Sequence, residues 1–301
     1  MGLSLGAAVL MVVGKVTAYL ITGSAAIFAD AAEALVHGVA TGGAAFALWY
    51  ADRPRDADHP YGHGKIVYFS AGFEGALIFV AGGGAIAIAI RGLLGHSELH
   101  KLGWGVAITG SLAALNLALG FVLIRVGRRQ SSLVLEANGK HVLADVWIGG
   151  GAVVGVCLTW ITGIRFFDPA AGLVVGVAIL FSAFGLLREA YRGLMERAEP
   201  ALGSALAEAL DAAQREGRIA GHHALRFRRV NDRAYIDVHL LLDGALSVAE
   251  GHRVATAVEG ALRGVRPELA DACITTHLEP AEEGHRPEAQ GAAHHDRGAD
   301  D

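Results

Sequence analysis

Charged residues are scarce in this chain. Asp, Glu, Lys and Arg make up only 18% of its 301 residues, whereas hydrophobic residues make up 53%, and the mean hydropathy is positive at +0.41. So few charges exclude an ordinary soluble protein of this size, because such proteins carry about a quarter charged residues. The composition therefore predicts a protein that crosses a membrane several times.

Cysteine is scarcer still. Cys157 and Cys273 are the only two, and they lie far apart in different kinds of segment. The chain can therefore build neither a disulfide framework nor a zinc site of paired cysteines, and we interpret both as ordinary thiols. A cleavage signature after the first apolar segment is also lacking, so we expect that segment to be retained.

Long apolar stretches fill the first two thirds of the chain. Each contains about 20 residues or more, which is enough to cross about 30 Å of hydrocarbon at 1.5 Å per residue. The six predicted spans are residues 3–22, 24–50, 66–92, 103–125, 133–162 and 168–188. An even number of spans predicts that both ends of the chain lie on the same side of the membrane.

The basic residues of the connecting loops indicate which side that is. The loop at 51–65 carries Arg53, Arg55 and Lys65, and further arginines follow the fourth and the sixth spans, whereas the opposite loops hold fewer. The positive-inside rule therefore predicts that both termini lie in the cytoplasm. We expect a multi-pass protein of a bacterial cytoplasmic membrane.

The pattern changes near residue 200. More than half of the acidic residues and of the histidines lie in the last third of the chain. The order helix, strand, strand, helix, strand is predicted there, which is typical of a small α+β domain of ferredoxin-like type. The expected fold is a six-helix transmembrane bundle (1–192), a cytoplasmic ferredoxin-like domain for metal binding and dimerisation (193–280) and a disordered, His-containing tail (281–301).

Two pairs of polar residues interrupt the apolar spans at helical spacing. Glu33 and His37 lie one turn apart in the second span, and His141 and Asp145 lie one turn apart in the fifth. At 1.5 Å per residue, Glu33 and His141 fall about 13 to 15 Å from a membrane surface. Because an ionisable residue in a span costs about 2.5 to 3.5 kcal/mol on insertion scales, these pairs require an explanation.

Two imidazoles and two carboxylates make a tetrahedral set that suits Zn²⁺ or a similar divalent ion. Two carboxylates also neutralise a dication, which lowers the cost of placing the set in lipid. The alternative is helix packing through ion pairs, such as His141 with Glu33. Lys15 in the first span fits either interpretation, because it can balance Asp30 or Glu33.

These residues belong to a longer series of motifs. In chain order, the motifs are "TGSAAIFADAAEALV", "HPYGHGK", "HVLADVW", "LRFRRV", "IDVHLLLD" and "ITTHLEP". Together with the expected topology, they resemble the cation diffusion facilitator family of divalent-metal/proton antiporters. The resemblance implies a homodimer whose cytoplasmic domains meet, and a metal held between the second and fifth spans and moved by alternating access.

The resemblance also implies three groups of metal-binding residues. These are Glu33, His37, His141 and Asp145 in the spans; Asp56, His59 and His63 in the inner loop; and His223, His239, His277 and Glu279 in the cytoplasmic domain, where His252 matches the helix position of a second metal centre. The family commonly has Asp or His at the first position of the transport site and Asp at the second, so Glu33 and especially His37 depart from its pattern. For the loop group, a loop without metal is the alternative.

The function implied is proton-coupled efflux of Zn²⁺, with Fe²⁺, Mn²⁺, Co²⁺ or Cd²⁺ as alternative cargo. Zn²⁺ is also the ion expected in a structural or regulatory role. Two other classes stay open, an intramembrane metalloenzyme that activates water and a non-transporting metal sensor. The chain lacks a hydrolase signature such as HExxH, and four intramembrane ligands argue against the sensor. The expected partners are a second copy, the lipid bilayer, metal ions and protons, with no nucleic acid.

Overall fold

The computed structural model describes residues 2–95, 99–129 and 133–281. Within these ranges it does not describe the side chains at 2–5, 7–8, 133–138, 141 and 144. The chain divides into two compact units, Met1–Tyr191 and Arg192–Asp301. Apart from Ala281, the predicted tail lies outside the described residues.

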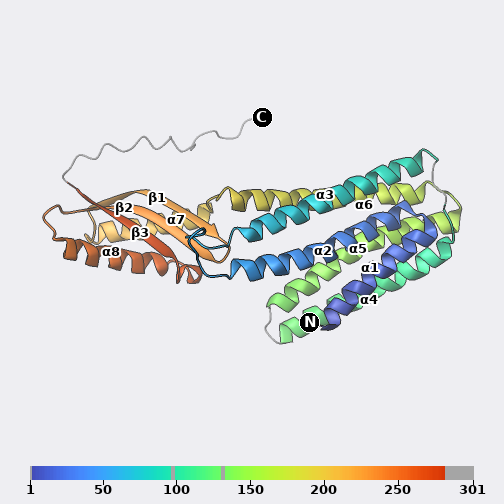
Figure 1. Cartoon of the computed structure of the whole chain (residues 1–301), viewed down its shortest axis with the longest axis horizontal. Helices are drawn as coiled ribbons and strands as arrows, with labels where there is room; N and C mark the ends of the chain where they lie inside the picture. The colour runs from blue at the N-terminus through green and yellow to red at the C-terminus, as the bar shows by residue number, and fades with distance from the viewer. Residues whose placement is uncertain (1, 96–98, 130–132, 282–301) are drawn as a thin grey trace. The chain divides into compact units, whose positions relative to one another are not determined.

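Over the described ranges, six long helices make up the first unit (Figure 1). They are α1 (Gly2–Thr22), α2 (Ala25–Ala51), α3 (Ile66–Leu93), α4 (Leu102–Arg129), α5 (Leu133–Thr162) and α6 (Phe167–Leu194). Five of them, α2 to α6, are long and apolar enough to cross a membrane, with Asp145–Thr162 as the qualifying part of α5. The apolar stretch found in α1, Val9–Thr22, is shorter. The structure thus has the predicted series of apolar helices, and α4 and α6 continue into arginines beyond their predicted ends.

Glycines allow these helices to approach closely. A Cβ at Gly75 of α3 would lie 2.9 Å from Cγ of Leu187 on α6. A Cβ at Gly139 of α5 would lie 2.8 Å from the backbone nitrogen of Ile124 on α4. In a membrane, helices associate largely through van der Waals contact, and small residues bring their backbones together.

Asp168, at the beginning of α6, is bound to the beginning of α2. Its carboxylate accepts hydrogen bonds from the Ser24 hydroxyl and from the Ala25 N–H, the second at 2.9 Å. Ser24 itself accepts a hydrogen bond from the Ile27 N–H at 3.1 Å and caps α2. Asp168 and Ser24 are fully buried. The carboxylate therefore pairs helix-end N–H groups that cannot reach water, and its charge matches the positive end of the α2 dipole.

The second unit is built on a three-stranded sheet of order β1-β2-β3. In chain order its elements are α7 (Pro200–Arg215), β1 (Gly221–Val230), β2 (Arg233–Leu242), α8 (Val248–Arg263), the short 3₁₀ helix η1 (Pro267–Leu269) and β3 (Cys273–Pro280). β1 and β2 form an antiparallel hairpin, and β3 pairs with β2 in parallel. The order of helices and strands is the one that the sequence predicts.

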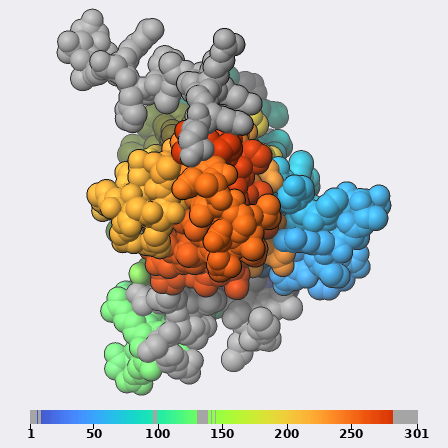
Figure 2. All heavy atoms as spheres, turned by 90° about the vertical axis from the view of Figure 1, so that its left-hand side faces the viewer, coloured from blue at the N-terminus to red at the C-terminus, as the bar shows by residue number. Residues whose placement is uncertain are grey.

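Alternation along β2 decides which face of the sheet is buried. Ile236, Val238 and Leu240 are at most 1% exposed, and they pack into a core with leucines of α7 and α8. Because successive side chains in a strand point to opposite faces, His239 lies on the face away from that core. In Figure 2 the atoms of this unit, yellow-orange to red, form one continuous mass.

Replacing Asp168 tests the link between α6 and α2. We expect Asp168→Asn to lower the melting temperature of the detergent-purified protein, because a poorly paired buried donor costs about 1–3 kcal/mol. Scanning fluorimetry measures the shift. Asp271→Asn, at an exposed position, is the matched control and should melt as the wild type does. Equal melting temperatures for the two variants would contradict the capping role.

Candidate metal-binding sites

The residues of the predicted transport site lie on α2 and α5, which pack against each other. Glu33 and His37 are one turn apart on α2, and Asp145 lies on α5. The carboxyl groups of Glu33 and Asp145 are close enough to interact electrostatically. His141 lies one turn before Asp145, and its side chain is outside the described ones. The structure thus places the two predicted carboxylates on neighbouring helices.

A buried ion pair lies beside these carboxylates. Lys15 Nζ is 2.7 Å from Asp30 Oδ1, and the two residues are only 7% and 2% exposed. Asp30 also faces α5, because a Cβ at Gly149 would lie 3.3 Å from Asp30 Oδ1. Of the two acidic partners considered for Lys15, the one it binds directly is Asp30. The ammonium group neutralises that carboxylate.

His37 has an acidic neighbour that is not among the residues predicted from the sequence. Its Nδ1 lies 3.7 Å from Oε1 of Glu74 on α3. Glu74 is the only acidic residue of that helix. Because a lone carboxylate in a span is costly, this isolation is the signal that marks Glu74 in the sequence.

The loop between α2 and α3 brings its three predicted ligands together. Asp56 Oδ1 is 3.0 Å from His59 Nδ1, and Asp56 Oδ2 is 3.3 Å from His63 Nε2. The three candidate ligand atoms lie within 4.8 Å of one another. His63 is buried, and its ring packs edge-on against Tyr50 with centroids 4.8 Å apart. One ligand of the three is therefore fixed by packing, whereas the other two are exposed.

The chemistry of the loop group fits a divalent cation. Desolvation raises the pKa of Asp56, but hydrogen bonds from His59 and the charges of His59 and His63 outweigh it, so the pKa lies below its ordinary value. In the part of the chain that the structure describes, Nδ1 of His63 is buried without a hydrogen-bond partner. An ionised carboxylate beside imidazoles is the donor set that zinc and similar ions bind.

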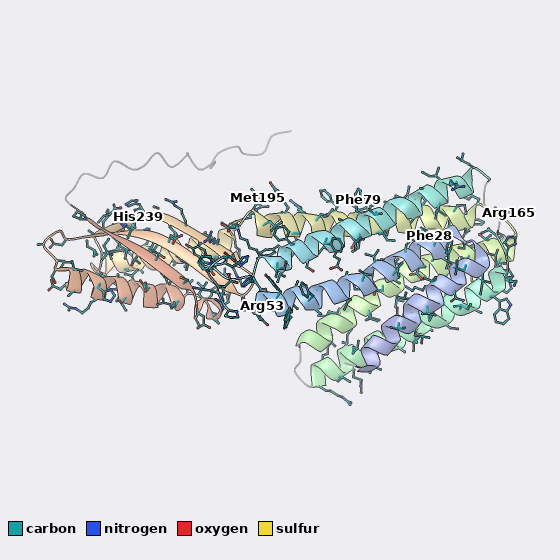
Figure 3. All side chains as sticks on the ribbon, in the orientation of Figure 1. Phe28, Arg53, Phe79, Arg165, Met195 and His239 are labelled. Carbon is teal, nitrogen blue, oxygen red and sulfur yellow. The ribbon has the colours of Figure 1, made fainter. Side chains whose placement is uncertain are left out.

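Three histidines form a row across the sheet of the second unit. His223, His239 and His277 are direct neighbours on β1, β2 and β3, and successive ring centroids are 4.9 and 4.8 Å apart. Glu279 follows on the same face, with Oε2 3.0 Å from His223 Nε2 and Oε1 2.7 Å from His239 Nδ1. Figure 3 labels His239 on this sheet. The carboxylate therefore joins two of the three imidazoles.

Three of the four residues predicted for this centre form one group that fits a metal ion. The ligand atoms of His223, His239 and Glu279 lie within 4.8 Å of one another. His277 lies at the margin, with Nε2 3.6 Å from Glu279 Oε1 and a side chain that is 66% exposed. Among the described residues, His252, which is predicted for a second metal centre, lies apart from this group. The reason is that α8, which carries His252, packs on the core side of the sheet, whereas the histidine row lies on the other side.

Both units match domains of known protein families. Residues 1–195 match the cation efflux transmembrane domain, and residues 204–281 match the cytoplasmic domain of cation efflux proteins. The chain belongs to the cation diffusion facilitator family. The second match also supports a homodimer and a metal ion as substrate.

Relatives of this transporter occur in bacteria and plants. An uncharacterised transporter of Synechocystis sp. is 36% identical over 93% of this chain and 89% of its own length. The cation-efflux pump FieF of Pectobacterium atrosepticum is 33% identical, over 91% and 89%. Metal tolerance protein C1 of Arabidopsis thaliana is 32% identical, over 90% of this chain and 60% of its own. The family resemblance is confirmed, and the protein is a cation efflux transporter, not an enzyme.

The Lys15–Asp30 pair can be tested by a double replacement. We expect Lys15→Met to destabilise the protein by about 3–5 kcal/mol, the usual cost of leaving one charge of a buried pair without its partner. Adding Asp30→Asn removes the orphaned charge, so the double variant should melt near the wild type. Melting temperatures of the purified proteins measure both effects. A double variant that melts no higher than Lys15→Met would contradict charge neutralisation.

Glu279 can be tested by counting bound metal. In full-length protein that carries Asp56→Ala to disable the loop group, we expect Glu279→Ala to lower the Zn²⁺ stoichiometry, because it removes the carboxylate that two imidazoles face. Equilibrium dialysis gives the count. Glu208→Ala, at an exposed position on α7, is the control. An unchanged count in Glu279→Ala would show that the row holds no zinc.

Proposed function

We propose that the protein exports Zn²⁺ from the cytoplasm in exchange for protons. The observation that supports this most directly is the approach of two carboxylates, Glu33 and Asp145, from different spans, each with a histidine one turn away, His37 and His141. Carboxylate and imidazole ligands suit zinc in a tetrahedral site. The same set accommodates Fe²⁺, Mn²⁺, Co²⁺ or Cd²⁺ as alternative cargo.

Competition between protons and metal supplies the coupling. Metal requires neutral imidazoles and ionised carboxylates, so binding expels protons and protonation expels metal. Facing the cytoplasm at near-neutral pH, the site loads the ion; facing a more acidic exterior, it takes up protons and releases the ion. Each pH unit of gradient supplies about 1.4 kcal/mol per proton exchanged. Moving a net charge adds about 2.3 kcal/mol per 100 mV.

The same proposal includes the membrane topology, the domain division and the role of the other two residue groups. With six spans both termini lie on one side of the membrane, and the arginines in the last turns of α4 and α6 support assigning that side to the cytoplasm of a bacterial cell. We propose the domain division 1–192, 193–280 and 281–301, with a ferredoxin-like second domain. The loop and sheet groups then face the cytoplasm as accessory zinc sites that stabilise or regulate the dimer. Alternating access moves the ion past α2 and α5.

Transport in sealed vesicles tests the proposal. We expect inside-out vesicles with an acidic interior to accumulate Zn²⁺, and Asp145→Ala to abolish the uptake because it removes half of the carboxylate pair. His37→Ala in the same assay shows whether this histidine is required. Glu189→Ala, at an exposed position on α6, is the control for a lost carboxylate. If the vesicles take up neither Zn²⁺ nor any of the alternative ions in response to the gradient, the proposal is wrong.

A further inference from the structure

We propose that Glu74 of α3 is a further cation-binding residue of the transport site and acts together with His37. The inference rests on the proposed function, because it assigns one more ligand to the same site. It makes α3 a third helix that contributes to the site, in addition to α2 and α5.

The spacing of the two side chains is the first argument. His37 Nδ1 and Glu74 Oε1 are 3.7 Å apart, which is too long for a good hydrogen bond. Two ligands of a tetrahedral zinc ion, each about 2.0 to 2.2 Å from the metal, lie about 3.4 Å from each other. The pair is therefore spaced for an ion between its members. By contrast, Lys15 and Asp30 are in direct contact at 2.7 Å and leave no such space.

Charge is the second argument. A neutral imidazole at position 37 binds a metal but brings no negative charge to attract a dication, whereas a carboxylate brings both. Lys15 already neutralises Asp30, which lies two turns from His37 on α2. Glu74 can thus supply from α3 the charge that His37 does not supply from α2. Its side chain is 21% exposed and that of His37 is 41% exposed, so neither is closed off by protein packing.

The order of groups along the helices is the third argument. Glu74 is the ninth residue of α3, so it lies about 12 Å along the helix from the end that joins the loop of Asp56, His59 and His63. On α2, His37 lies one turn nearer that loop than Glu33 does. An ion that enters from the loop end therefore meets Glu74 and His37 before it reaches Glu33 and Asp145. The four residues form a path that leads from α3 through α2 to α5.

Glu74→Gln is the decisive variant, because it keeps the size of the side chain and removes its charge. In the vesicle assay we expect its KM for Zn²⁺ to rise by at least about tenfold, the lower end of what a metal site loses with a supporting partner. Glu189→Gln, the exposed carboxylate of α6, should transport as the wild type does. His37→Asp combined with Glu74→Gln returns a carboxylate to the pair from α2, so this double variant should recover most of the lost affinity.

A binding measurement separates this inference from the proposed function. Zn²⁺ affinity is measured by competition with a fluorescent chelator, on full-length protein that carries Asp56→Ala and Glu279→Ala to disable the other two groups. Weaker binding in Glu74→Gln supports the inference even if the vesicles transport nothing, an outcome that would overturn only the transport proposal. Unchanged affinity in Glu74→Gln, or a loss that His37→Asp does not repair, would overturn the inference.

Discussion

A charge in the hydrocarbon layer has to be neutralised, and the polar groups of the helical unit meet this constraint in three ways. Lys15 neutralises Asp30 by direct contact. Asp168 is held by hydrogen bonds from the beginning of α2. Glu33 and Asp145 differ from both, because two groups of the same sign approach each other. Like charges in a low-dielectric layer favour protonation or a bound cation, and on the proposed function the exchange between these two states couples metal to protons.

The two units are stabilised by different forces, and this difference decides where each unit can carry polar side chains such as histidine. In the second unit, water drives Ile236, Val238 and Leu240 into a core, and the alternate face of the sheet is left for polar side chains. The helices of the first unit gain little by hiding apolar groups from lipid and depend on close contact at glycines instead. The candidate ligands on the sheet therefore occupy a surface that water reaches, at little cost, whereas charged side chains in the spans are tolerated only with partners.

The sequence predicts the helices and strands of this protein better than it predicts which side chains meet across different elements. Apolar length and strand alternation indicate the helices and the strands, and the family resemblance points to His223, His239 and His277. Helical spacing places Glu33 and His37 on one face, but it does not say which helix that face meets. For this reason helical spacing predicts neither the partner of Lys15 nor the role of Glu74, because each contact joins two different helices. The separation of His252 from the other ligands likewise depends on which side of the sheet α8 covers.

The histidine row has a consequence for how the second unit matures. Its members come from three strands, and β3, the last of them along the chain, carries both His277 and Glu279. Sliding β3 by one residue would turn both side chains to the opposite face of the sheet. The ligand group is thus assembled only when the final strand has joined the sheet in the correct register. A chain whose last strand is missing or mispaired therefore lacks the complete set of candidate ligands.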